Sequence, residues 1–179
     1  PDDVLWIHDF HLIPLGAELR GMGVKNPIGF FLHIPLPPSQ MMLSIPQSTW
    51  LMRSLFAYDM VGFQTEIDRK HFRRFVTEEV GGEDLGNGQL RAWSSTVVAK
   101  AFPIGVDARP FGALARTREA VQAAERLRTR NLGRTSIIGV DRLDYSKGLP
   151  QRMRSFERLL ETYPENRSKV VFTQVAPPT

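Results

Sequence analysis

Residues 28–35 read Ile-Gly-Phe-Phe-Leu-His-Ile-Pro, and the first five of these residues decide the fold class. Because all five are apolar, they indicate a strand buried on both faces, as in parallel sheets that are covered by helices. The strand ends at His33. Residues 34–38 contain three prolines, which exclude regular structure because proline lacks a backbone donor and has a fixed φ. The sequence therefore predicts a central strand followed by a rigid loop that begins with a histidine.

Outside this stretch, strands and helices alternate along the chain. Apolar residues at helical spacing separate the predicted strands, most clearly at 149–163. Residues 81–95 are polar and rich in glycine, so they predict a loop or a small hairpin. Residues 111–134 have a weaker apolar stripe, and we interpret them as a connection between two lobes. The alternation predicts an α/β fold with mostly parallel sheets and flanking helices. The other predicted strands lie at residues 4–8, 60–63, 96–98, 101–102, 136–140 and 170–172.

The composition excludes several classes of protein. Of the 179 residues, 42% are hydrophobic and 23% are charged, which argues against a disordered or fibrous chain. The absence of cysteine excludes disulfide scaffolds, thiolate metal sites and a cysteine nucleophile, and it fits a cytoplasmic location. No apolar run approaches the roughly 20 residues that span a bilayer, so we expect no membrane partner.

The charge distribution does not predict a nucleic-acid partner. The formal net charge is +4, which is too mild to indicate nucleic-acid binding by itself. Four basic residues cluster at positions 69, 70, 73 and 74, but no aromatic stacking platform accompanies them. We therefore interpret Arg69, Lys70, Arg73 and Arg74 as the solvated face of a helix.

Three loops that directly follow predicted strands are candidate functional sites, because parallel sheets bind ligands beyond the carboxyl ends of their strands. The first loop contains Asp9, where a carboxylate could contact sugar hydroxyls or could cap the helix predicted to begin near Leu12. A metal site built from His8 and His11 is a third interpretation, although the sequence marks no third ligand. The second loop begins with His33, either a satisfied interior histidine or one that the proline loop orients toward a substrate.

The third loop lies between the strand at 136–140 and the helix that follows. Arg142 and Lys147 stand on either side of this turn, and the helix after them would offer free N–H groups and positive potential. Gly148 allows close approach of the backbone, and Pro150 is tolerated in a first helical turn. The loop therefore suits a diphosphate, while an Arg142–Asp144 or Asp144–Lys147 surface pair is the simpler alternative.

Taken together, these loops resemble the trehalose-6-phosphate synthase family of retaining glycosyltransferases. One such motif would be a weak signal, but six motifs occur in the family's order along the whole chain. Phe10 departs from the pattern because family members usually carry tyrosine there. The matching stretches are WIHDFHL (6–12), GFFLHIP (29–35), YDMVGFQT (58–65), FPIGVD (102–107), VDRLDYSKGLP (140–150) and QVAPP (174–178).

The resemblance implies two Rossmann-like domains that face a cleft. Residues 1–114 would be the later part of the acceptor-side domain, and residues 115–179 the start of the nucleotide-sugar domain. The chain begins and ends at predicted strands and lacks the family's first and last segments. We therefore expect a central fragment that is inactive by itself.

The resemblance also implies roles for four residues. Asp9 matches the aspartate that contacts the acceptor sugar, and His33 matches the histidine beside the donor glucosyl group. Arg142 and Lys147 match the pair that binds the donor diphosphate and stabilises the departing nucleotide. No metal and no cofactor are implied.

The implied reaction is glucosyl transfer from UDP-glucose to glucose 6-phosphate with retention, and a homo-oligomer is a possible state. Two alternatives stay open. One is a relative with another acceptor, such as a glucosylglycerol-phosphate synthase or a pseudoglycosyltransferase. The other is a non-catalytic regulatory homologue, against which the presence of all four site residues argues.

Overall fold

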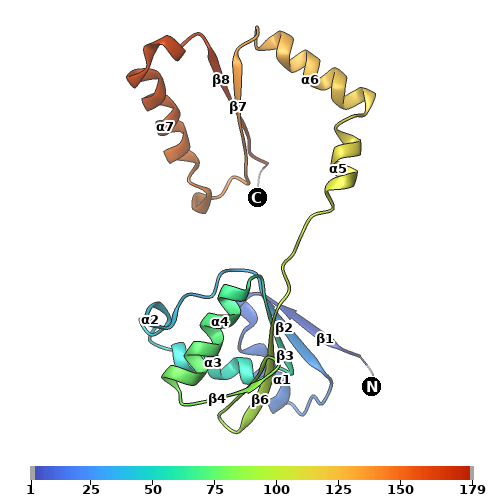
Figure 1. The fold of residues 1–179 in the computed structure, drawn as a ribbon, viewed down its shortest axis with the longest axis vertical. Helices are drawn as coiled ribbons and strands as arrows, with labels where there is room; N and C mark the ends of the chain where they lie inside the picture. The colour runs from blue at the N-terminus through green and yellow to red at the C-terminus, as the bar shows by residue number, and fades with distance from the viewer. Residues whose placement is uncertain (1–2, 178–179) are drawn as a thin grey trace. The chain divides into compact units, whose positions relative to one another are not determined.

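The computed structural model describes residues 3–177, and the chain divides into two compact units (Figure 1). The first unit comprises Pro1–Val106 and the second Asp107–Thr179. The division falls just before the helix α5 (Ala108–Leu114). The domain boundary after residue 114, which the resemblance implies for the family, stays a prediction.

The first unit is built on a six-stranded sheet with the order β1-β2-β3-β6-β5-β4. The strands β1, β2, β3 and β6 are parallel, as the alternation of strands and helices predicted, whereas β4 and β5 form an antiparallel hairpin beside β6. This hairpin is the one anticipated in the polar residues 81–95. The strands are β1 (Leu5–His8), β2 (Ile28–Leu32), β3 (Met60–Phe63), β4 (Glu83–Gly86), β5 (Gln89–Ala92) and β6 (Ser95–Ala101).

In the described part of this unit, residues 3–106, four α-helices connect the strands. The helix predicted from Leu12 instead begins at Leu15, because Asp9 and Pro14 place a separate 3-10 turn at Phe10–Leu12. The fourth helix ends in a π-helical segment, Phe75–Glu79. The helices are α1 (Leu15–Gly21), α2 (Ser39–Met42), α3 (Ser48–Ser54) and α4 (Glu66–Arg74), and a 3-10 turn at Leu55–Ala57 follows α3.

The hydrophobic core lies on the face of the sheet that these helices cover. Phe30 and Phe63 alternate with residues of the opposite face and are fully buried. Phe30 packs against Tyr58 with ring centroids 5.1 Å apart, and Phe63 packs against Phe72 of α4 at 5.4 Å. Phe31 points to the other face, where it contacts the rings of two histidines rather than this core.

Tyr58 joins the core to the loop that carries Asp9. Its hydroxyl accepts a hydrogen bond from the backbone N–H of Gly16 at 2.9 Å and donates to the carbonyl of Leu12 at 2.8 Å. A Cβ at position 16 would overlap the Tyr58 ring, so glycine is required there for this close approach. Burial raises the pKa of Tyr58 above its ordinary value of 10.0, although the Gly16 N–H opposes the shift.

We expect Tyr58→Phe to lower the free energy of unfolding by about 1–3 kcal/mol, because it leaves the buried Gly16 N–H without its acceptor. The neutral hydroxyl is favoured in the fold, so this contribution should be complete below pH ~10 and decrease as the pH rises through the raised pKa. Urea unfolding of both proteins at several pH values measures it. A difference that grew with rising pH would contradict this account.

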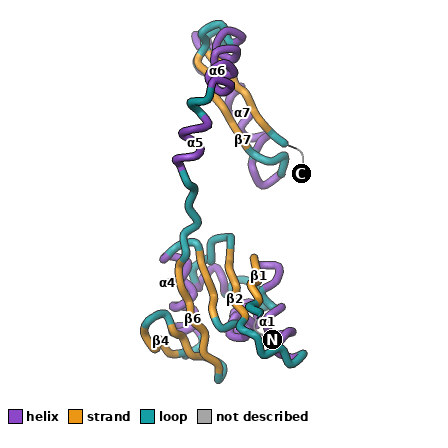
Figure 2. The backbone as a smooth tube through the Cα atoms, turned by 90° about the vertical axis from the view of Figure 1, so that its right-hand side faces the viewer, coloured by secondary structure: helices purple, strands orange, loops and turns teal. Residues whose placement is uncertain are grey.

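Within residues 107–177, the second unit consists of a two-stranded parallel sheet and three α-helices. β7 (Thr135–Val140) pairs with β8 (Val170–Val175) in register from Thr135 opposite Val170 to Val140 opposite Val175. Residues 111–134 contain the end of α5 and the whole of α6 (Arg118–Arg130). The helix α7 (Leu149–Thr162) connects the two strands (Figure 2). Phe156 of α7 packs against Phe172 of β8 with ring centroids 5.4 Å apart.

This second unit has little interior. None of the residues from 107 to 177 is fully buried, and Ile138 and Val140 of β7 are 69% and 64% exposed. Within residues 3–177, no helix combines the length and the apolar character needed to cross a membrane.

Candidate functional site

Asp9 follows β1 in a strained conformation. Its φ of 72° and ψ of 161° lie in a region that is almost exclusive to glycine, and residues held there cost about 1–3 kcal/mol. The Asp9 carboxylate accepts a hydrogen bond from the N–H of Phe10 at 2.9 Å, and its own N–H donates to the carbonyl of Phe31 at 2.8 Å. Asp9 therefore caps the short 3-10 turn Phe10–Leu12, and not the α-helix that the sequence predicted from near Leu12. Strain of this kind concentrates at functional sites.

His33 follows β2, the strand next to β1. Since β1 and β2 are parallel, with His8 opposite Phe31, Asp9 and His33 lie at the same edge of the sheet. The His33 side chain is exposed. Among the described residues 3–177, His33 is therefore a surface histidine at the carboxyl edge of the sheet. The alternative prediction, a histidine buried in the interior, is wrong for this part of the chain.

Two side chains of α4 anchor the proline loop after His33 through the backbone of Leu36. The N–H of Leu36 donates to the Asp68 carboxylate at 3.0 Å, and its carbonyl is 2.7 Å from Nδ1 of His71. Because a carbonyl only accepts, the His71 Nδ1 must carry the hydrogen. Asp68 is 5% exposed and also accepts a hydrogen bond from the Thr65 hydroxyl at 2.6 Å. The loop that begins with His33 is thus tied to a core helix.

We expect Asp68→Ala to lower the free energy of unfolding by about 1–3 kcal/mol, because the buried N–H of Leu36 loses its acceptor. Glu66→Ala is the matched control, since Glu66 lies on the same helix and its exposed carboxylate pairs with Arg69. Such pairs contribute about 0–1 kcal/mol. Urea unfolding midpoints measure both effects, and equal losses in the two variants would contradict the role of Asp68.

His8 contacts His33 directly, and the sequence analysis did not anticipate this pairing. The His8 Nδ1 lies 2.8 Å from the His33 Nε2, and the ring centroids are 5.1 Å apart. Trp6, His8, Phe31 and His33 line a hollow of about 400 Å³ on the face of the sheet away from the core, together with residues 102–104. From the sequence, we considered His8 only as a metal ligand together with His11. In the structure, the His11 ring packs against the Phe10 ring, with centroids 3.7 Å apart.

Arg142 and Lys147 are both exposed in the turn between β7 and α7. Arg142 approaches the Asp144 carboxylate at 3.9 Å, a long surface pair. The backbone N–H of Lys147 donates to the carbonyl of Asp144 at 3.1 Å, whereas its ammonium group forms no hydrogen bond or ion pair with residues 3–177. Gly148 has φ 63° and precedes α7, whose first turn contains Pro150, so both residues take the places that the sequence predicted.

Asp144 organises this turn. Its carboxylate accepts a hydrogen bond from the N–H of Ser146 at 2.8 Å and caps the 3-10 turn Tyr145–Lys147. That hydrogen bond is the main cause that lowers the pKa of Asp144 below its ordinary value, with smaller contributions from Arg142 and Lys147. Asp144 is therefore ionised at neutral pH and holds the turn that presents Lys147.

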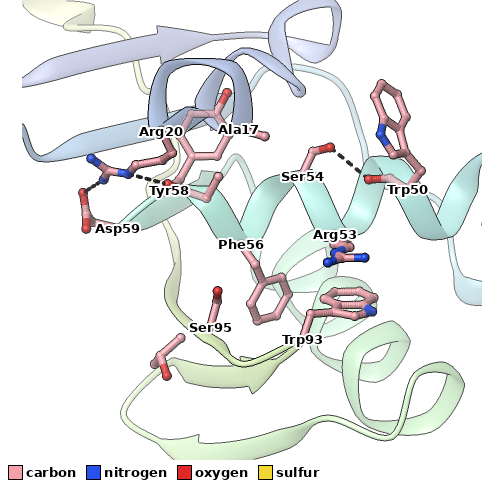
Figure 3. A pocket seen from close by; sticks show the side chains of 12 residues that line it. Ala17, Arg20, Trp50, Arg53, Ser54, Phe56, Tyr58, Asp59, Trp93 and Ser95 are labelled. Carbon is pink, nitrogen blue, oxygen red and sulfur yellow. Dashed lines mark hydrogen bonds and ion pairs between the residues drawn. The ribbon is translucent and has the colours of Figure 1, made fainter. Parts of the chain in front are cut away.

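A larger hollow of about 710 Å³ lies at the opposite edge of the sheet, where β3 begins (Figure 3). Arg20 and Asp59 form an ion pair in its wall at 2.9 Å, and Arg20 also donates to the carbonyls of Val24, Asn26 and Ala57. Asp59 accepts a hydrogen bond from the N–H of Ile28 at 2.7 Å. These two polar side chains hold the starts of β2 and β3 together, so we place the candidate site at the carboxyl edge instead.

The other surface features fit simpler roles. In the basic cluster on α4, Arg69 pairs with Glu66 at 2.7 Å and Arg73 with Asp84 at 3.5 Å, as expected for a solvated helix face. Within residues 3–177, no three His, Asp or Glu side chains are grouped so that they could hold a metal ion.

Comparison with known proteins identifies the class to which this fold and these loops belong. The sequence matches Glycosyltransferase family 20 over residues 1–179, and the chain therefore belongs to that family. The curated relatives include trehalose-6-phosphate synthases from Sinorhizobium fredii, 44% identical over 177 residues, and from Klebsiella pneumoniae, 42% identical over 177 residues. Each alignment covers 99% of this chain, and 38% and 37% of the respective relative.

Solved structures show the same relationship. The chain matches a trehalose-phosphate synthase from Burkholderia xenovorans in complex with glucose-6-phosphate, with a TM-score of 0.86 and 46% identity. It also matches the E. coli enzyme bound with UDP-2-fluoro glucose, with a TM-score of 0.83 and 38% identity. Both matches cover 99% of this chain, and 40% and 39% of the respective structures. The chain therefore spans about two fifths of the length of these relatives.

Proposed function

We propose that this chain is part of a hexosyltransferase that moves glucose from UDP-glucose to glucose 6-phosphate with retention and so forms trehalose 6-phosphate. The observation that supports this most strongly is the match to Glycosyltransferase family 20 along the whole chain. The two relatives bound to glucose-6-phosphate and to UDP-2-fluoro glucose suggest the acceptor and the donor. Another trehalose-6-phosphate synthase that this chain resembles is described in terms of glycosyl transfer with retention.

Within this proposal, the first unit contacts the sugars. The Asp9 carboxylate accepts hydrogen bonds from hydroxyls of the acceptor, which would explain why the strained conformation of Asp9 is kept. His33, exposed at the same edge of the sheet, contacts the donor glucosyl group through its ring. These contacts orient the acceptor hydroxyl toward the carbon of the donor glucose at which one bond breaks and another forms. Positioning of this kind lowers the activation barrier of the transfer.

The second unit binds the donor diphosphate in the same proposal. Arg142 and Lys147 are exposed cations at one turn, and the pairing of Arg142 with Asp144 at 3.9 Å leaves its donors largely available. As the sugar leaves, negative charge increases on the nucleoside diphosphate, and fixed cations stabilise that charge. The acceptor hydroxyl then attacks on the face from which the diphosphate leaves, and its proton passes to the phosphate.

The test uses the full-length protein with UDP-glucose and a panel of acceptors. We expect UDP release with glucose 6-phosphate, a slower reaction with glycerol phosphate, and a product with the α configuration at the transferred carbon. Preference for another acceptor would favour a different member of the family. Absence of transfer with every acceptor would favour a regulatory homologue.

The 179-residue chain is the comparison protein in that assay, and we propose that it does not transfer glucose alone. It spans about two fifths of its relatives, and residues 107–177 contain no fully buried residue. Catalysis of this kind depends on holding two substrates in position, and in the isolated chain the diphosphate-binding turn has no hydrophobic interior to support it. Turnover comparable to that of the full-length protein would overturn this expectation.

A further inference from the structure

His8 and His33 meet although they are 25 residues apart in the sequence. The parallel register of β1 and β2 sets His8 opposite Phe31, so His33 lies two residues further along the neighbouring strand and on the same face. The two rings are offset, inclined by 30°, and joined through Nδ1 of His8 and Nε2 of His33 at 2.8 Å. The pairing therefore follows from the strand register as well as from the side chains.

The hydrogen bond couples the tautomers of the two rings. A neutral imidazole has one donor nitrogen and one acceptor nitrogen, and a bond between two nitrogens contains one hydrogen. If the His33 Nε2 donates, then its Nδ1 is a bare acceptor; if the His33 Nε2 accepts, then its Nδ1 carries the hydrogen. The tautomer of His8 therefore decides whether the Nδ1 of His33 offers a hydrogen-bond donor or an acceptor to a ligand.

The His8 ring has aromatic neighbours on two sides, although the His8 side chain is exposed. The Trp6 ring meets it edge-on with centroids 5.8 Å apart, and the Phe31 ring lies 6.4 Å away. Trp6 in turn lies across Gly29 of β2, where a Cβ would overlap its ring. These neighbours place the His8 ring beside the exposed ring of His33.

We propose that His8 is a positioning residue for His33, and that it sets the rotamer and the tautomer with which His33 contacts the donor sugar. This inference rests on the proposed glucosyl transfer. It assigns His8 no contact with substrate. Its effect is transmitted through one hydrogen bond, and so it should depend on the hydrogen-bonding atom of residue 8 rather than on its bulk.

The experiment compares two substitutions in the full-length protein. His8→Phe keeps a ring against Trp6 and Phe31 but removes the hydrogen bond, whereas His8→Asn supplies a donor or acceptor near the position of Nδ1. We expect His8→Phe to lower kcat 10- to 100-fold with KM for glucose 6-phosphate within twofold and an unchanged unfolding midpoint. His8→Asn should recover most of the kcat. Wild-type kcat in His8→Phe, or no recovery in His8→Asn, would overturn the proposal.

A second readout separates this inference from the proposed function. In protein labelled with ¹⁵N-histidine, the ring nitrogen shifts of His33 report its tautomer whether or not glucose is transferred. We expect one dominant tautomer in the wild type and a mixture in His8→Phe. His11→Phe is the matched control and should leave the His33 shifts unchanged, since His11 stacks on Phe10. Identical His33 shifts in wild type and His8→Phe would overturn the inference, while an absence of transfer in all proteins would count against the proposed function alone.

Discussion

Asp9→Gly should keep the stability of the wild-type fold and lose most of the transferase activity. Glycine adopts φ 72° and ψ 161° without the strain of about 1–3 kcal/mol that other residues bear there. This gain offsets the loss of the hydrogen bond to the N–H of Phe10. Loss of a carboxylate contact to the acceptor, at about 1.5–3 kcal/mol, should lower kcat/KM about 10- to 100-fold.

Asp9→Ala is the control, because it removes the same carboxylate but keeps the strain. We expect it to be less stable than Asp9→Gly by about 1–3 kcal/mol and equally inactive. At ordinary positions alanine is the more stabilising of the two residues, so the sign of the difference is diagnostic. Urea unfolding and initial rates of UDP release measure the two effects. Near-wild-type rates in both variants would show that Asp9 caps the 3-10 turn and does not contact the acceptor.

Arg142→Ala and Lys147→Ala should each weaken the binding of UDP about 10- to 100-fold without unfolding the protein. Each substitution removes a charge-assisted contact to phosphate of about 1.5–3 kcal/mol. Both side chains are exposed, so little packing is lost. Calorimetric titration of the full-length protein with UDP measures the change in Kd.

Arg158→Ala is the matched control for these two variants, because Arg158 is an exposed arginine of α7 that pairs with Glu161 at 3.3 Å. We expect its Kd for UDP to stay within twofold of wild type. If UDP affinity were unchanged in both Arg142→Ala and Lys147→Ala, these residues would belong to surface pairing instead of donor binding.

The sequence predicted the fold where burial alone determines local structure. β2 and β3 have the predicted bounds because residues 28–32 and 60–63 are continuous apolar runs in the middle of a parallel sheet. The prediction was wrong for the start of α1, where Pro14 and the strained Asp9 impose a separate turn. Local conformational preference therefore overrode the helical spacing of the leucines.

The candidate site was only partly predictable, because its supporting contacts depend on tertiary structure. Asp9 and His33 were singled out by their places after strands, and both do lie at the carboxyl edge. The bond between His8 and His33 needs the register of two strands, and the buried Asp68 needs Leu36, which is 32 residues away. The spacing of these residues in the sequence does not reveal either of these two contacts.

The hairpin β4–β5 bears on how this protein avoids aggregation. An exposed sheet edge offers unpaired backbone groups to strands of other molecules. Here the edge of β6 is covered by β5, and the outermost strand β4 has only four residues, all exposed, with Glu83 and Asp84 among them. Its register also shifts between Asp84 and Gly86. A short, acidic and irregular strand is a poor template, so the hairpin protects this side of the sheet against intermolecular strand addition.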